Sequence, residues 1–154
     1  MDLDINALET SFDHIAARGD ELMDVFFERL FAAEPSVQPL FFAADMKRVK
    51  GTLLVGLVLF RKSLRNLESV TPALRGLGAR HVRYGARSEH YPVVGGTLIA
   101  SMAEIAGDAW AIEHEKAWTE AFAVASGAML EGAQSVASVT WPFDASCMRH
   151  RLAS

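Results

Sequence analysis

Cysteine and long hydrophobic runs are nearly absent from this sequence. The single cysteine, Cys147, cannot form an internal disulfide, and one cysteine is too few for a cysteine-rich zinc site. The longest apolar run, Leu53 to Phe60, is far shorter than the roughly 20 residues that cross a bilayer. The first twenty residues are acidic and do not resemble a secretory signal. We therefore expect a soluble, cytoplasmic protein that does not act on a membrane.

The sequence also lacks the motifs of several common enzyme classes. It contains no G-x-x-x-x-G-K-[ST] phosphate loop, no G-x-G-x-x-G dinucleotide motif and no His-Glu-x-x-His zinc motif. Its 19 acidic and 15 basic side chains give a net charge of −4, which argues against a dedicated nucleic-acid-binding protein. Apolar residues make up 51% of the 154 positions, which is enough for one hydrophobic core, so we expect one domain.

Apolar residues recur at helical intervals along the chain, and no alternating strand pattern is visible. The clearest stripe has spacings of three and four and consists of Met46, Val49, Leu53, Leu57, Phe60 and Leu64. The predicted helical segments are 4–17, 20–33, a short turn at 35–41, 46–64, 71–85, 88–107 and a last helix from 108 or 112 to about 138. Asp20, Asp45 and Thr71 are the expected N-caps. The sequence predicts an all-α domain at 1–138 followed by an irregular tail at 139–154.

One of the five histidines differs from the others in its neighbours. His14, His90, His114 and His150 lie among polar residues and are expected on the surface. His81 shares a helical face with Leu74, Leu77 and Gly78. Two interpretations of His81 are open at this point. It is either a core imidazole bonded to a backbone carbonyl or an axial ligand of haem iron.

Three segments together resemble the bacterial single-domain globins and the haem domains of flavohaemoglobins. LRNLESVTPALRGLGARHVRYGARSEHYPVVGGTLIASM is similar to the family's stretch with the proximal histidine. FFERLFAAEPSVQPLF resembles its second helix and corner, and AWTEAFAVASGAML its last helix. The similarity covers roughly residues 5–138. It implies a globin fold, a three-over-three helical sandwich, around one haem b (iron protoporphyrin IX).

The resemblance also implies roles for individual residues around the haem. It identifies His81 as the iron ligand, because the ten-residue step to Tyr91 matches the family's pairing of ligand and tyrosine. The aromatic residue that wedges the haem falls on Phe41. The resemblance also implies that Leu77, one turn before His81 on the same helix, packs beneath the porphyrin, and that Val94 and Leu98 line the cavity from the next helix.

The gas-binding side departs from the family pattern. The position commonly held by glutamine or histidine falls on Val49, the next turn gives Leu53, and Phe27 replaces a tyrosine. We expect this distal wall, which has no side-chain donor, to weaken O₂ retention and shift preference toward CO or NO. A slip of one residue in the preceding corner would bring Lys50 or Arg48 to the pocket mouth. Met46 is a further alternative iron ligand.

Of the two polar residues that the family has beside the iron ligand, the sequence matches one. Tyr91 matches the family tyrosine, but the glutamate position falls on Ala133, and Glu131 is expected to point elsewhere. The resemblance implies reversible binding of a diatomic gas, such as oxygen transport or storage. One alternative is nitric oxide dioxygenation with a separate reductase, which the chain is too short to contain. Others are haem-based sensing with a partner, or an interaction module without iron. The sequence does not indicate the natural ligand or the oligomeric state.

Overall fold

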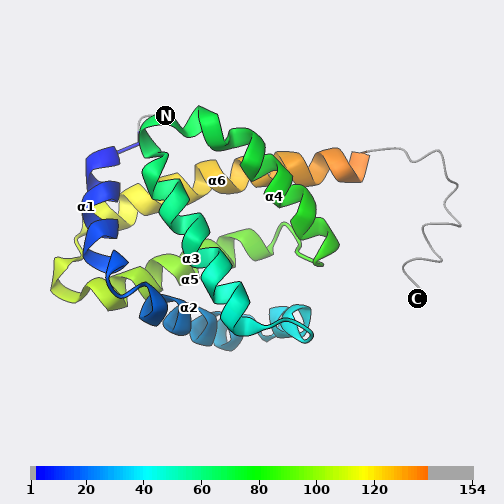
Figure 1. Ribbon diagram of the computed structural model, residues 1–154, viewed down its shortest axis with the longest axis horizontal. Helices are drawn as coiled ribbons and strands as arrows, with labels where there is room; N and C mark the ends of the chain where they lie inside the picture. Colours follow the sequence, from blue (N-terminus) through cyan, green and yellow to red (C-terminus); the bar gives the residue numbers. More distant parts are fainter. Residues whose placement is uncertain (1–2, 139–154) are drawn as a thin grey trace, which may run out of the picture.

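The computed structural model describes residues 3–138, and these form helices joined by short connections (Figure 1). No strand occurs within that range, so the all-α prediction is confirmed there. Within the same range, no helix is both long and apolar enough to cross a membrane. The predicted tail at 139–154 lies outside the described residues. The elements are α1 (Ile5–Ala16), α2 (Gly19–Ala33), η1 (Pro35–Phe41), α3 (Met46–Lys62), η2 (Leu64–Val70), α4 (Thr71–Arg83), α5 (His90–Ala106), η3 (Gly107–Ala109) and α6 (Ile112–Ser138).

The expected helix caps are right at one position and wrong at two. Asp45 caps α3, and its carboxylate accepts a hydrogen bond from the Lys47 N–H at 3.1 Å. Asp20 is not a cap, because α2 begins one residue earlier, where Gly19 is buried close to the Leu54 side chain. Thr71 is not a cap either. It is the first residue of α4, which follows η2 directly, and its hydroxyl donates to the Leu67 carbonyl instead.

The helices pack in pairs around a core that lies toward one end of the molecule. α2 lies along α5 and α4 crosses α6, while α1 contacts both α5 and α6 (Figure 1). At the centre, the fully buried Trp118 on α6 is surrounded by the rings of Phe12, Phe60 and Phe122, with centroids 5.3 to 6.5 Å away. Its indole N–H donates to the buried Ser11 hydroxyl at 2.8 Å. This bond satisfies a donor that burial would otherwise make costly.

α3 is held more firmly at its end than at its beginning. Near the end, Leu57 and Phe60 are buried, and the Arg61 guanidinium binds Glu9 and Asp13 on α1 at 3.2 and 3.0 Å. At the beginning, Val49 is only partly buried, as are the neighbouring inward positions of the predicted stripe. The stripe therefore does form one packed face, but its first half leaves apolar surface open.

α4 and α6 approach each other at two glycines. A Cβ atom added to Gly78 would lie 1.8 Å from the Met129 carbonyl oxygen, and one added to Gly132 would lie 1.8 Å from the Arg75 carbonyl oxygen. Backbone therefore packs on backbone here, which no residue with a side chain would allow. An ion pair of 3.0 Å between Arg75 and Glu131 lies beside the crossing. The crossing fixes where α4 lies relative to α6.

Candidate functional site

His81 lies in the last turn of α4, and a backbone carbonyl orients its ring. The distance between Nδ1 and the Leu77 carbonyl oxygen is 2.8 Å. A carbonyl oxygen can only accept, so Nδ1 carries a proton, and in the neutral imidazole Nε2 then keeps a free lone pair. The ring is only partly buried, and Nε2 has no partner among residues 3–138. A histidine that binds a metal through one nitrogen has this arrangement, with the other nitrogen held by a second group.

The turn after His81 fixes the backbone of that residue as well. The N–H of Ala86 donates to the His81 carbonyl at 3.0 Å, and the N–H of Gly85 donates to the Val82 carbonyl at 3.1 Å. These two bonds form a Schellman motif, which requires a left-handed residue after the cap. Gly85 supplies that conformation with φ of 90°, and it also lies close to the Leu40 side chain.

Apolar side chains on three helices are left incompletely buried. Val49 and Leu53 on α3, Leu77 on α4 and Val94 on α5 are all partly buried, whereas Leu98 is buried at 3% exposure. α4 packs against α6 and has almost no close backbone contact with α3, although η2 joins the two in the chain. The incompletely buried residues are therefore an apolar surface that a flat hydrophobic cofactor would cover.

The two predicted phenylalanines belong to one aromatic cluster. Phe27 on α2 is 4% exposed, and its ring meets the ring of Phe41 edge-on with centroids 5.7 Å apart. Phe31 contacts both rings at 5.9 and 5.6 Å. The cluster links α2 to the end of η1 and presents no hydrogen-bond donor.

The alternative distal ligands differ in their surroundings. The Lys50 ammonium donates to the Asp24 carboxylate on α2 at 3.0 Å, and Arg48 is exposed. Met46 is partly buried and packs against the hydrophobic core. Lys50 is thus engaged in an ion pair, whereas Met46 has no polar partner among the described residues.

Tyr91 and Glu131 form no polar network with His81 in the described residues. Tyr91 is partly buried, and burial raises the pKa of its phenol above the ordinary value. Its hydroxyl has no hydrogen-bond partner within residues 3–138 and does not contact the His81 nitrogen. As expected, Glu131 points away, because it is exposed and paired with Arg75.

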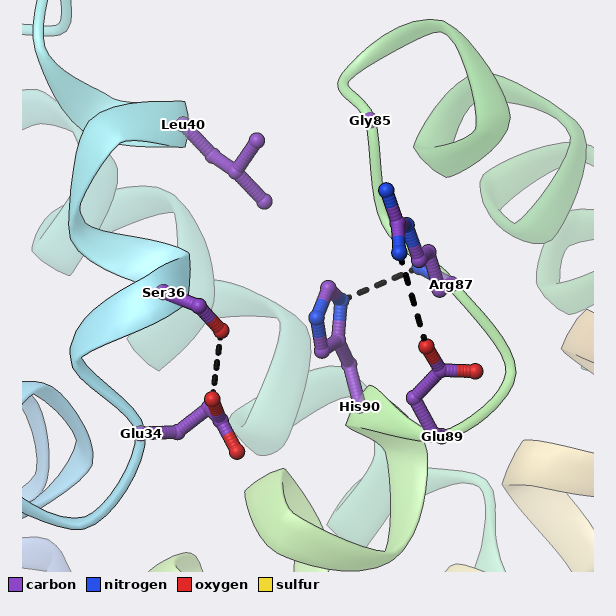
Figure 2. A pocket seen from close by; sticks show the side chains of 7 residues that line it. All are labelled: Glu34, Ser36, Leu40, Gly85, Arg87, Glu89 and His90. Atoms are coloured by element: carbon purple, nitrogen blue, oxygen red, sulfur yellow. Dashed lines mark hydrogen bonds and ion pairs between the residues drawn. The ribbon is translucent and has the colours of Figure 1, made fainter.

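A polar hollow of about 390 Å³ lies between η1 and the segment that joins α4 to α5 (Figure 2). The His90 ring lies between the hydrogen-bonded pair Glu34–Ser36 and Arg87, and its Nδ1 accepts the Arg87 N–H at 3.0 Å. None of the residues predicted to contact a cofactor lines it. The lining residues are Glu34, Ser36, Leu40, Gly85, Arg87, Glu89 and His90.

Sequence reasoning missed two features of the site. One is the glycine crossing that positions α4, for which Gly78 on the face of His81 was the available signal. The other is Tyr84, whose ring meets the His81 ring edge-on with centroids 5.6 Å apart. Its spacing of three residues from His81 on a helix was the signal for that contact.

Comparison with known proteins defines the class. A model of the globin family matches residues 24–129, and the chain belongs to this family. It is similar to the flavohemoprotein of Vibrio cholerae, with 28% identity over 120 residues, 77% of this chain and 30% of that protein. It is 31% identical to the flavohemoprotein of Rhizobium meliloti over 110 residues, 70% of this chain and 27% of that protein. The chain thus spans less than a third of the length of these relatives.

Solved structures give the same fold. An engineered carbene transferase, a putative nitric oxide dioxygenase from Rhodothermus marinus, superposes with a TM-score of 0.79 at 22% identity, covering 88% of this chain and 94% of that one. A bacterial globin from Campylobacter jejuni superposes with a TM-score of 0.73 at 21% identity, covering 86% and 95%. The predicted globin fold is therefore confirmed.

Haem is the cofactor that membership of this family brings, and the residues fit it. Nε2 of His81 offers a free nitrogen lone pair, which iron requires. Partly buried apolar side chains on α3, α4 and α5 offer the surface that a porphyrin ring requires.

Proposed function

We propose that Nε2 of His81 binds the haem iron and that a diatomic gas binds reversibly on the opposite, apolar side. The observation that carries this proposal is the 2.8 Å hydrogen bond between Nδ1 and the Leu77 carbonyl, because it leaves Nε2 free and aims the ring. When bound, haem supplies an iron atom with an open position for O₂, CO or NO. The chain's own residues then decide which gas is retained.

The proximal residues favour reversible binding over oxygen activation. A neutral carbonyl holds the His81 ring, and the predicted glutamate position is Ala133, so no carboxylate within residues 3–138 increases the electron donation of the imidazole. Tyr91 does not contact the ring either. These features support storage or transport of a gas.

The distal residues favour gases of low polarity. Phe27, Val49 and Leu53 carry no donor, and Phe27 is fixed in the aromatic cluster. A donor to a charged acceptor is worth about 1.5–3 kcal/mol, which corresponds to roughly one to two decades in affinity. Bound O₂ is more polar than CO or NO, so this pocket is expected to release O₂ fast relative to the other two.

One comparison favours a second function. The neighbour from Rhodothermus marinus is described as a putative nitric oxide dioxygenase, and the related flavohemoproteins are much longer than this chain. Nitric oxide dioxygenation would need a reductase that returns ferric iron to the ferrous state. Rapid NO-dependent oxidation of the oxygenated form, sustained by such a reductase, is the measurement that favours this alternative.

Absorption spectra of the ferric, ferrous and CO-bound protein test the iron ligand. His81→Gly is expected to lose the bands of a histidine-bound haem and to regain them when free imidazole is added. His90→Ala is the matched control, because His90 lies in the polar hollow with its Nδ1 occupied. If His81→Gly keeps an unchanged spectrum without imidazole, the assignment of His81 is wrong.

Val49→Gln tests the distal side. The added amide donor is expected to slow O₂ dissociation by roughly 10- to 100-fold, with a smaller effect on CO. Val49→Leu changes side-chain volume without adding a donor and is the control. Equal slowing of O₂ and CO in the glutamine variant would contradict the polarity argument.

A further inference from the structure

We propose that the exposed side of the last turn of α4 is a docking surface for an acidic electron-carrier protein. The surface, called the arginine patch, consists of Arg80 and Arg83 beside Tyr84 at the end of α4. This inference rests on the proposed function, because O₂ and CO bind ferrous iron and ferric haem must therefore be reduced by a donor.

The local charge differs in sign from that of the whole chain. Residues 71–88 contain four arginines and no aspartate or glutamate, whereas the chain carries a net charge of −4. Arg75 pairs with Glu131, and Arg87 lies 3.8 Å from Glu89. Arg80 and Arg83 are exposed and form no ion pair with any residue in the described range 3–138. Two positive charges are thus available to a partner.

Helix stability alone does not explain the patch. Cations in the last turn of a helix interact favourably with its dipole, which accounts for Arg80 and Arg83. It does not account for Tyr84, which is 59% exposed beside them. An exposed tyrosine among arginines has the composition of a protein interface, where both residue types are enriched.

Tyr84 also connects the surface to the proposed iron ligand. Its ring is exposed on one side and meets the His81 ring edge-on at 5.6 Å between centroids. A carrier on the patch is therefore one side chain away from the imidazole. In the transfer, one electron leaves the carrier's anionic flavin hydroquinone, which becomes the neutral semiquinone, and the ferric iron becomes ferrous. No covalent bond forms or breaks in this step.

The number of cations favours a compact acidic protein over an extended polyanion. Nucleic acids and anionic lipid surfaces present many negative charges, which would meet only two unpaired arginines and then the negative charge of the rest of the chain. An acidic protein can match a small patch and be steered to it at long range.

Binding and reduction by a flavodoxin test the proposal. Calorimetry with oxidised flavodoxin measures the dissociation constant at ionic strengths of about 0.01 M and about 1 M, where the Debye length is about 30 Å and about 3 Å. The double variant Arg80→Glu/Arg83→Glu is expected to weaken binding about tenfold or more at low salt and to lose most of the salt dependence. The second-order rate of reduction by flavodoxin hydroquinone is expected to fall in parallel.

The matched control is Lys62→Glu/Lys116→Glu, which changes the net charge equally at exposed positions on α3 and α6. It is expected to keep most of the wild-type affinity and rate. A neutral deazariboflavin radical, which needs no docking surface, is expected to reduce all three proteins at one rate.

Three results would overturn the proposal. They are equal weakening in both double variants, preferred binding of DNA or anionic vesicles, and loss of a dimer of this chain in the arginine variant alone. A failure of the proposed function is separate, because the spectrum of His81→Gly reports it without any carrier.

Discussion

Gly132→Ala is expected to destabilise the protein because the added methyl group meets the backbone of α4. Its Cβ would lie 1.8 Å from the Arg75 carbonyl oxygen, so the helices must separate by about 1.2 Å to reach 3.0 Å, the shortest distance that real Cβ atoms show. A gap of about 0.5–1 Å between two atoms in contact already removes a quarter to a half of their dispersion energy. Overpacking of this kind costs about 1–3 kcal/mol.

The helix propensity of alanine opposes this loss by about 1 kcal/mol, so a net loss of up to about 2 kcal/mol is expected. Urea unfolding gives the free energy, and the thermal midpoint should fall by up to about 8 °C for a chain of this length. Gly127→Ala is the control on the same helix, where the new Cβ meets nothing within 4 Å. It should stabilise by about 0.5–1 kcal/mol. If both variants change stability in the same direction, the packing argument is refuted.

Two further predictions concern buried polar groups. Burial raises the pKa of Tyr91, so the unfolded chain loses the phenolic proton first and stability falls as pH rises above about 10. In urea titrations at several pH values, Tyr91→Phe should remove this decrease in stability, whereas Tyr84→Phe should retain it. Ser11→Ala leaves the buried Trp118 N–H without an acceptor and should cost about 1–3 kcal/mol of unfolding free energy. Ser101→Ala should cost less, because the Ser101 hydroxyl donates only to a carbonyl of its own helix. Equal losses in the two variants would contradict this reasoning.

Periodicity predicted the helices well because most of them bury one apolar face. The stripe from Met46 and the cap at Asp45 are local signals, and both appear in the structure. The predicted caps at Asp20 and Thr71 are wrong, because the start of each helix depends on structure that the local sequence does not show. Gly19 packs on a distant helix, and Thr71 follows η2, a turn that no periodicity marks.

The site was predictable only in part. The spacing of His81 and Leu77 predicts that they share a helical face. A hydrogen bond from His81 to a backbone carbonyl was one of the two interpretations that the sequence left open, and the structure contains it. The glycine crossing was not predictable, because the match of Gly78 with α6 depends on a helix about fifty residues later. The sequence does not show whether Arg80 and Arg83 are unpaired, because a carboxylate on another helix could lie beside them in the fold.

The unequal hold on α3 has a mechanical consequence for the proposed gas site. The end of this helix is clasped to α1 by Arg61, while its beginning, with Val49 and Leu53, rests on partly open apolar contacts and one exposed ion pair from Lys50. Segments with fewer buried contacts open at lower free energy than the core. The first turns of α3 are therefore expected to open at a lower free energy than the core around Trp118, and such opening would give a small molecule a route to the proposed gas site.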